Sequence, residues 1–256
     1  MEITIVQLDS VWEDASANFG RVEKLLMGTR PRPGSLVILP EMFATGFSLD
    51  LTKTCAGRAR DTEQFLKVLS GKHQVGVMGG LVRPGNDGLG RNEALVLSPS
   101  GEVLARYLKQ RPFSGGGEDL THERGYEGVT FKWGGLRVAP LICYDLRFPE
   151  LFRGAAKAGA EVFIVIAAWP KVRIEHWVTL LRARAIENQA YVIGVNRTGE
   201  EPNRPCGGRS LVVDPHGVIV ADAGENEGVL AATLDPKVVR SWREEFPAYQ
   251  DFLRWS

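Results

Sequence analysis

The chain has 256 residues, of which 44% are hydrophobic and 24% are charged, and its 31 basic and 31 acidic residues give a formal net charge of zero. These are ordinary values for a globular protein. The even charge balance excludes the basic excess that is typical of proteins dedicated to nucleic acid or to an anionic membrane surface. No Pro/Ser-rich linker and no internal repeat divides the chain, so we expect a single domain over residues 1–256.

The first residues and the cysteines bear on the compartment. Residues 1–9 have no basic region followed by a long apolar stretch, so they do not match a secretory signal. No segment approaches the ~20 apolar residues of a membrane span. The three cysteines, Cys55, Cys143 and Cys206, are too widely spaced for a complete disulfide framework, which favours a reducing compartment. We therefore expect a cytoplasmic protein with no membrane partner.

Apolar periodicity predicts alternating strands and helices in the first half of the chain. Aliphatic runs indicate strands, and apolar residues spaced three and four apart, such as Phe19, Val22 and Leu26, indicate helices. The Pro-Ser-Gly sequence at 99–101 marks a turn between two of the strands. Strands are expected at 3–8, 36–39, 75–82, 94–97 and 103–107, and helices at 18–26 and 62–69.

The second half begins with a polar, glycine-rich segment at 113–125, which we expect to be a surface loop. Hairpin-like pairs are expected at about 94–107 and 211–234. The alternation predicts an α/β fold with either one mixed sheet or two stacked sheets with helices outside. Strands are predicted at 136–142, 161–167, 191–195, 211–213, 218–220 and 228–234, and helices at 150–158, 175–189 and within the aromatic-rich tail, 237–256.

Three chemically reactive residues stand at the ends of predicted strands. Glu41, Lys109 and Cys143 each close an apolar run. Ligand sites in α/β sheets favour the carboxyl ends of strands. Charged residues follow the cysteine at once, beginning with Asp145, and then a helical pattern begins. This indicates a strand–turn–helix junction, where a nucleophile can be held accessible at the end of a sheet.

The three residue types fit one chemistry. A cysteine thiolate is a nucleophile, and a nearby cation lowers the cost of forming it. Glu41 could take the thiol proton, while Lys109 and the backbone N–H of Tyr144 could stabilise an oxyanion. Taken alone, each residue also has a structural interpretation: an inert core thiol, a solvated loop carboxylate, or a charge at a sheet edge. Spacing along the chain does not show that the three meet.

Segments around these residues closely resemble the signatures of the nitrilase, or carbon–nitrogen hydrolase, superfamily, whose members carry a Glu–Lys–Cys catalytic set. The similarity spans nearly the whole chain, and it implies that Glu41, Lys109 and Cys143 are catalytic. The matching segments are LPEMFATGF at 39–47, YLKQRPF at 107–113, CYDLRFPE at 143–150, RARAIENQAY at 182–191 with Asn196 and Arg197, and FPAYQD at 246–251.

The resemblance also implies an architecture and an assembly. The implied fold is an α/β four-layer α-β-β-α sandwich of the nitrilase type. Members of the superfamily usually form homodimers in which two sandwiches stack. The aromatic tail at 246–255 is then expected at or near the interface, or else packed on its own subunit.

A second glutamate after the lysine is a further family position. Glu118 is our match and would orient Lys109, and Glu123 is the competing match because this loop differs from that of relatives. The chain also departs from the usual pattern where relatives often have asparagine before a Trp-Pro pair, because here Ala168 precedes Trp169. Trp169 is expected either to line the pocket or to pack in the core.

Within the superfamily the chain is most similar to the ω-amidase branch, which acts on 2-oxo acid amides such as 2-oxoglutaramate and 2-oxosuccinamate. These substrates carry a carboxylate, and Arg147 is the matching candidate to bind it bidentately. The alternative for Arg147 is a structural salt bridge with Asp145 or Glu150. Phe43 and Phe47 are expected to form the apolar wall of the substrate site, or simply to pack in the core.

Other chemistries lack support in the sequence. The four histidines show no metal-ligand spacing, and no Walker A loop, dinucleotide fingerprint or Gly-x-Ser-x-Gly elbow is present. We expect no metal, no cofactor and no nucleic-acid partner. The expected function is hydrolysis of a small carboxylate-bearing amide to the acid and ammonia through a cysteine thioester. N-Carbamoyl amino acids or nitriles are alternative substrates, and a catalytically inactive binding module is the alternative of another class.

Overall fold

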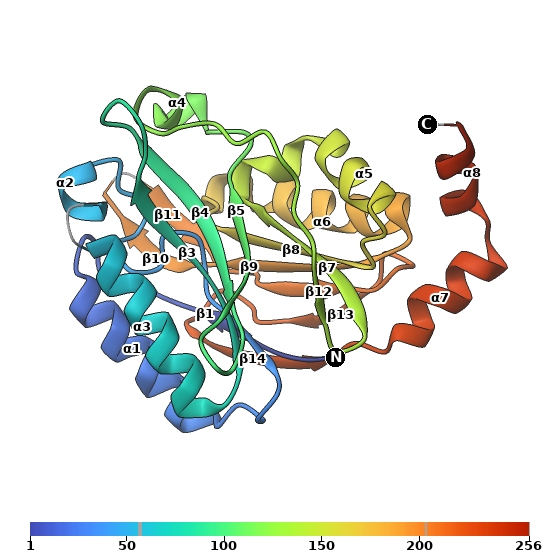
Figure 1. Ribbon diagram of the computed structural model, residues 1–256, viewed down its shortest axis with the longest axis horizontal. Coiled ribbons are helices and arrows are strands. Elements are labelled where there is room, and N and C mark those ends of the chain that lie inside the picture. The colour runs from blue at the N-terminus through green and yellow to red at the C-terminus, as the bar shows by residue number, and fades with distance from the viewer. Residues whose placement is uncertain (56–57, 203, 256) are drawn as a thin grey trace.

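A computed structural model describes residues 1–55, 58–202 and 204–255. Within these ranges, two six-stranded sheets lie face to face and helices cover the outer face of each sheet (Figure 1). This arrangement confirms the predicted α-β-β-α sandwich. The outer layers are α1 (Ala15–Thr29) and α3 (Arg58–His73) on the first sheet, and α5 (Pro149–Lys157) and α6 (Ile174–Asn188) on the second.

The first sheet is mixed and has the strand order β14-β1-β2-β3-β4-β5. Its central strands β1, β2 and β3 are parallel, whereas β14, β4 and β5 run antiparallel to their neighbours. The strands are β1 (Glu2–Gln7), β2 (Leu36–Ile38), β3 (Gly76–Pro84), β4 (Gly90–Leu97), β5 (Val103–Leu108) and β14 (Gly228–Thr233).

The second sheet has the order β13-β12-β9-β8-β7-β6, and its strands β7, β8 and β9 are parallel. The carboxyl ends of these three strands therefore lie at the same end of the sheet, and Cys143 directly follows β7 there. The strands are β6 (Phe131–Trp133), β7 (Leu136–Ile142), β8 (Val162–Ala167), β9 (Tyr191–Asn196), β12 (Leu211–Val213) and β13 (Ile219–Asp222).

The two-residue period of a strand explains the layering. On β2, Leu36 and Ile38 belong to the core between the two sheets, whereas Val37 and the following Leu39 pack with α1 and α3. All four side chains are fully buried. A strand buried on both faces has no polar alternation, which is why these runs are continuously apolar.

Smaller elements complete the chain. α7 and α8 lie at the carboxyl end, on one side of the sandwich (Figure 1). They pack against it, because Val239 of α7 is fully buried in the core and the Tyr249 hydroxyl of α8 donates to the Ala156 carbonyl of α5 over 2.8 Å. No helix among the described residues is long and apolar enough to cross a membrane. The remaining elements are α2 (Leu51–Thr54), α4 (Glu118–Thr121), β10 (Thr198–Glu201), β11 (Arg204–Gly207), α7 (Pro236–Glu245) and α8 (Ala248–Trp255).

Two sequence-based predictions about the elements were right only in part. Within 211–234, β12 and β13 form an antiparallel pair as expected, but β14 leaves this unit and pairs with β1 in the first sheet. The segment 113–125 is not only a polar surface loop, because it contains a short 3-10 turn and α4, and Glu118 in α4 is fully buried. The ribbon formed by β10 and β11 was not predicted.

Candidate active site

Glu41, Lys109 and Cys143 lie together where β2, β5 and β7 end. Cys143 and Lys109 directly follow their strands, and Glu41 comes three residues after β2. The Lys109 Nζ donates to Glu41 Oε1 over 2.8 Å, and both side chains are fully buried. The backbone of the Glu41 segment packs so closely on Gly80 of β3 that a Cβ there would lie 2.6 Å from the Glu41 Cα. The sheets thus bring together residues that are far apart in the sequence.

The turn after β7 holds Cys143 in a strained conformation. Its φ of 46° lies in the left-handed region, which is costly for a residue with a Cβ and is often found at functional sites. The buried Asp145 fixes this turn by accepting hydrogen bonds from the Ile142 N–H (3.0 Å), the Arg111 N–H (2.9 Å) and the Tyr107 hydroxyl (2.7 Å). Burial raises the pKa of Asp145 to about 6 even though these hydrogen bonds act in the opposite direction.

The surroundings of Cys143 favour the protonated thiol. Burial raises its pKa well above the usual range, and the nearby negative charge of Glu41 raises it further, whereas Lys109 acts in the opposite direction. A hydrogen bond between the thiol and Glu41 also favours the protonated form. The site therefore pairs a neutral thiol with a carboxylate placed to receive its proton.

Lys109 is held between two carboxylates. Its Nζ lies 2.8 Å from Glu118 Oε2 and 3.1 Å from Glu118 Oε1, in addition to its contact with Glu41. Burial alone would lower the pKa of Lys109, but Glu118 and Glu41 outweigh it and raise that pKa, so the ammonium stays charged. Glu123 instead contacts the Asn86 N–H and lies 3.8 Å from Arg91. The structure thus places Glu118, and not Glu123, beside the lysine.

Asn92 on β4 is a site residue that the sequence analysis missed. Its Nδ2 donates to Glu41 Oε1 and to Glu118 Oε1, each over 2.8 Å, and its backbone carbonyl accepts from the Lys109 N–H over 3.0 Å. The side chain is 1% exposed. The only available signal was an amide side chain shortly before a run of apolar residues. That signal is too general to predict a role.

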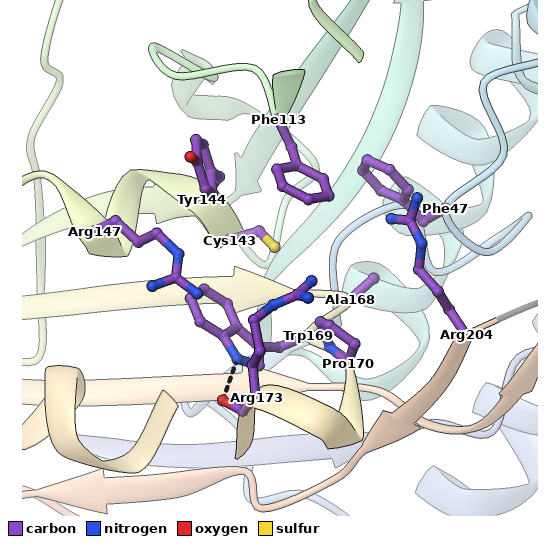
Figure 2. A pocket seen from close by; sticks show the side chains of 10 residues that line it. All are labelled: Phe47, Phe113, Cys143, Tyr144, Arg147, Ala168, Trp169, Pro170, Arg173 and Arg204. Carbon is purple, nitrogen blue, oxygen red and sulfur yellow. Dashed lines mark hydrogen bonds between the residues drawn. The ribbon is translucent and has the colours of Figure 1, made fainter. Parts of the chain in front are cut away.

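A cavity that is partly open to solvent lies beside the cysteine (Figure 2). Trp169 lines it and is also buried in the core cluster, so the structure agrees with both alternatives considered for this residue. Its indole N–H donates to the Arg173 carbonyl over 2.8 Å. The lining residues are Phe47, Phe113, Cys143, Tyr144, Arg147, Ala168, Trp169, Pro170, Arg173 and Arg204.

Phe43 does not line this cavity, which corrects the sequence-based expectation. Its fully buried ring packs in the core under the first helical layer, with its centroid 6.1 Å from those of Phe19 and Phe65. Phe47 lines the cavity instead. Although Phe43 is only two residues beyond Glu41, the intervening turn directs its ring to the opposite face of the sheet.

Arg147 does not form either of the salt bridges considered for it within the described ranges. Asp145 accepts the hydrogen bonds that fix the cysteine turn, and Glu150 pairs with Arg111 over 3.0 Å. The guanidinium of Arg147 lies over the Trp169 ring, 4.8 Å from its centroid, and 3.4 Å from His176 Nδ1. It therefore faces the cavity with its charge uncompensated by a carboxylate of the described residues.

Two further observations concern metal ions and the orientation of Glu41. Among the described residues, no group of three or more His, Cys, Asp or Glu side chains is arranged to hold a metal ion. Ala168 lines the cavity, and its N–H donates to Glu41 Oε2 over 3.0 Å. The second oxygen of Glu41 is thereby oriented by the chain that follows β8.

Comparison with known proteins supports the family resemblance that the sequence indicated. The carbon–nitrogen hydrolase family model matches residues 2–244. The chain is 32% identical to 2-oxoglutaramate amidase of Bacillus subtilis, covering 98% of this chain and 97% of that protein. It is 35% identical to omega-amidase YafV of Escherichia coli K12, covering 98% and 96%. The crystal structure of XC1258 from Xanthomonas campestris, a CN-hydrolase superfamily protein with an arsenic adduct in its active site, superposes with a TM-score of 0.90 at 31% identity, covering 98% of this chain and 96% of that one. This chain is therefore a member of the carbon–nitrogen hydrolase family.

Proposed function

We propose that this enzyme hydrolyses the terminal amide of a small carboxylate-bearing acid, such as 2-oxoglutaramate or 2-oxosuccinamate, to the free acid and ammonia. The observation that carries the proposal is the buried Glu41–Lys109–Cys143 cluster, which opens onto a cavity with an unpaired arginine. The similarity to proteins named 2-oxoglutaramate amidase and omega-amidase supports this substrate class.

The first half of the reaction forms a thioester. Glu41 accepts the Cys143 proton as the sulfur attacks the amide carbonyl carbon, so no thiolate has to persist in the buried site. The oxyanion that develops is stabilised by the Lys109 ammonium and by the backbone N–H of Tyr144. Glu41 then gives its proton to the nitrogen, the C–N bond breaks, and ammonia leaves.

The second half returns the enzyme to its starting state. Glu41 takes a proton from a water molecule, which attacks the thioester carbonyl carbon. The same two donors stabilise the second oxyanion. The C–S bond breaks, the carboxylic acid leaves, and the proton held by Glu41 returns to the Cys143 sulfur. One amide and one water thus give one acid and one ammonia, with no external oxidant or reductant.

Arg147 supplies the recognition of the substrate carboxylate in this proposal. Its guanidinium is restrained over the Trp169 ring and one amino group contacts His176 Nδ1, which leaves its other N–H groups for the substrate. A carboxylate can accept two parallel hydrogen bonds from such a group. Trp169 and Phe47 then form the apolar wall along which the carbon chain of the substrate lies.

The test of the proposed function is a substrate panel. Ammonia release is measured with 2-oxoglutaramate, 2-oxosuccinamate, an N-carbamoyl amino acid and an aliphatic nitrile at equal concentration. The 2-oxo acid amides are expected to give the highest kcat/KM. Faster turnover of the carbamoyl compound or the nitrile would reassign the substrate, and no turnover of any of them would contradict the proposal.

Asn92 provides a prediction about the positioning of the two carboxylates. Replacing Asn92 with alanine removes hydrogen bonds to Glu41 and Glu118, and we expect kcat/KM to fall by roughly 10- to 100-fold, as for the loss of hydrogen bonds to charged groups. The hydrogen bond from Asn92 is one of the causes that lower the pKa of Glu118. The acid limb of the pH profile should therefore move to higher pH, whereas a purely structural role would lower activity equally at all pH values.

We also propose that the enzyme is a cytoplasmic homodimer. All three cysteines are free thiols, which suits a reducing compartment. The tail carries exposed apolar side chains at Phe246, Leu253 and Trp255, the last of them 76% exposed, as expected for a surface that a second copy covers. Light scattering in solution should give twice the chain mass of 28.2 kDa, and a monomeric mass would contradict the dimer.

A further inference from the structure

The cysteine and its two partners come from different sheets. Glu41 and Lys109 follow strands of the first sheet, whereas Cys143 follows β7 of the second. The layer between the sheets is an apolar core, and apolar contacts are non-directional. Catalytic groups need to be held to about 0.5 Å, which directional contacts between supporting residues provide. Hydrogen bonds that cross from one sheet to the other near the sulfur are therefore of special interest.

Asp145 makes such hydrogen bonds from the turn that carries the cysteine. Its Oδ2 accepts from the Tyr107 hydroxyl over 2.7 Å, and its Oδ1 accepts from the Arg111 N–H over 2.9 Å. Tyr107 comes two residues before Lys109, and Arg111 comes two residues after it. One carboxylate of the second sheet therefore holds the lysine segment of the first sheet on both sides of Lys109.

The same carboxylate is tied to the cysteine. Its Oδ2 also accepts from the N–H of Ile142, the residue before Cys143, over 3.0 Å. The Arg184 guanidinium of α6 donates to the Leu146 carbonyl over 2.8 Å and so holds the turn to the helical layer of its own sheet. Of these contacts, those of Asp145 are the ones that reach the first sheet.

Both members of the Tyr107–Asp145 pair are suited to this contact. The Tyr107 side chain is 1% exposed and faces the core between the sheets. Burial and the charge of Asp145 raise the pKa of Tyr107 well above its usual range, so the phenol remains a donor. Within the ranges that the structure describes, the fully buried Asp145 forms no salt bridge. A neutral residue would avoid the cost of burying this carboxylate, which indicates a role other than stability.

We propose that the Tyr107–Asp145 pair positions the Cys143 sulfur against Lys109 and Glu41, and that it thereby sets the rate of thioester formation. Neither member of the pair lines the cavity, so both act through the catalytic residues and not on the substrate. A displacement of about 1 Å can lower a rate about 100-fold, so one lost hydrogen bond between the sheets is enough to be measured. This inference rests on the proposed function, because it uses the same nucleophile and the same oxyanion donor.

Two substitutions test the pair with 2-oxoglutaramate as substrate. Tyr107→Phe keeps the ring and removes the hydroxyl, and kcat is expected to fall about tenfold, the effect of losing one hydrogen bond to a charged group. Asp145→Asn leaves one acceptor oxygen for three donors, and kcat should fall about 100-fold. KM should not change in either variant, because no group that contacts the substrate is altered. An unchanged kcat in Tyr107→Phe, or a loss that appears only in KM, would overturn the inference.

Tyr191→Phe is the matched control. Tyr191 is also buried, and its hydroxyl donates to the Asp235 carbonyl over 3.4 Å. It lies at the amino end of β9, which is the opposite end of the second sheet from Cys143. Urea denaturation should show a loss of unfolding free energy in both tyrosine variants, whereas kcat should fall only in Tyr107→Phe. An equal fall of kcat in Tyr191→Phe would assign the effect to lost stability and overturn the inference.

A measurement without any amide separates this inference from the proposed function. Iodoacetamide alkylates the Cys143 sulfur, and the rate depends on how the thiol is placed to give its proton to Glu41. Mass spectrometry of the peptide that contains Cys143 should show slower alkylation in Tyr107→Phe and in Asp145→Asn, but not in Tyr191→Phe. Unchanged alkylation in the first two variants would overturn the positioning role. If the unmodified enzyme does not turn over 2-oxoglutaramate, the proposed function fails, while slower alkylation in these variants still supports the positioning role.

Discussion

Replacing Glu41 with glutamine is expected to lower kcat/KM by roughly 10⁴-fold, the upper range for loss of a general acid–base group. Glutamine has the size of glutamate and can still accept a hydrogen bond from Lys109. It cannot accept the Cys143 proton, and it cannot deliver a proton to the leaving nitrogen. Burial and the nearby Glu41 raise the pKa of the Cys143 thiol, so the attack on the carbonyl needs a base to take the thiol proton. Ammonia release from 2-oxoglutaramate measures the effect.

A matched control keeps this result specific. Glu123→Gln removes a carboxylate from the same active-site end of the first sheet, but that carboxylate contacts Asn86 and Arg91 rather than the catalytic cluster. We expect this variant to retain activity within a few-fold of the unmodified enzyme. A Glu41→Gln variant that keeps a tenth or more of the activity would contradict the role of Glu41 as the base.

Replacing Lys109 with methionine is expected to lower both stability and activity. The substitution leaves Glu41 and Glu118 buried without their shared cation, and breaking a buried ion pair in this way typically costs about 3–5 kcal/mol in the free energy of unfolding. Loss of one oxyanion donor typically lowers kcat by about 10²- to 10³-fold. Urea denaturation and steady-state kinetics measure the two effects separately.

The pH dependence of unfolding distinguishes this cause from a simple packing defect. Burial tends to raise the pKa of Glu118, but Lys109 and the hydrogen bonds outweigh it and lower that pKa. In the unmodified enzyme Glu118 therefore stabilises the fold at neutral pH, and this contribution is lost as the pH falls through the folded-state pKa. Without Lys109 the sign reverses, because burial favours the protonated acid, so Lys109→Met should become more stable as the pH is lowered toward 5. A stability deficit that does not change with pH would contradict the charge argument.

A second substitution tests the same point from the other side. Glu118→Gln in the Lys109→Met background removes one of the two unpaired charges and should recover part of the lost free energy of unfolding. Activity should not recover, because the oxyanion donor is still absent. Recovery of activity without recovery of stability would show that Lys109 acts differently from this account.

The strand ends were the predictable part of the site. Glu41, Lys109 and Cys143 follow apolar runs that are long enough to be read as buried strands, and ligand sites in α/β folds favour the carboxyl ends of strands. The sequence did not show that β2 and β5 of the first sheet and β7 of the second end at the same place. The resemblance to a known family then gave these residues roles. Glu118 was proposed only from that resemblance, because a polar, glycine-rich segment carries no signal that one of its acids turns inward.

Other parts of the site were not predictable from the sequence. Phe43 and Phe47 are the same residue type in an irregular turn. Unlike a helix or a strand, such a turn has no repeating side-chain direction from which to predict which ring faces the cavity. Arg173 ends the 3-10 turn Lys171–Arg173 and Arg204 begins β11, and these separate segments line one cavity with Arg147. Phe113 of the same cavity comes from a third segment.

The misassigned strand pairing has a related cause. Strands that follow each other in the sequence usually pair, which favoured hairpin-like pairing across 211–234, and β12 and β13 do pair in this way. By contrast, β14 pairs with β1, so that Gly228 to Thr233 lie opposite Gln7 to Glu2. Such a long-range pairing depends on the sandwich as a whole, and no local pattern in either strand specifies it.

The central claim is that the reaction passes through a thioester on Cys143. Its most direct test is intact-protein mass spectrometry after the enzyme is mixed with 2-oxoglutaramate and quenched with acid. The account predicts a mass increase equal to the acyl group of the substrate, present in the Cys206→Ala control, whose buried thiol lies outside the catalytic cluster, and absent in Cys143→Ala. An active Cys143→Ala enzyme, or an acyl adduct that persists in it, would contradict the account.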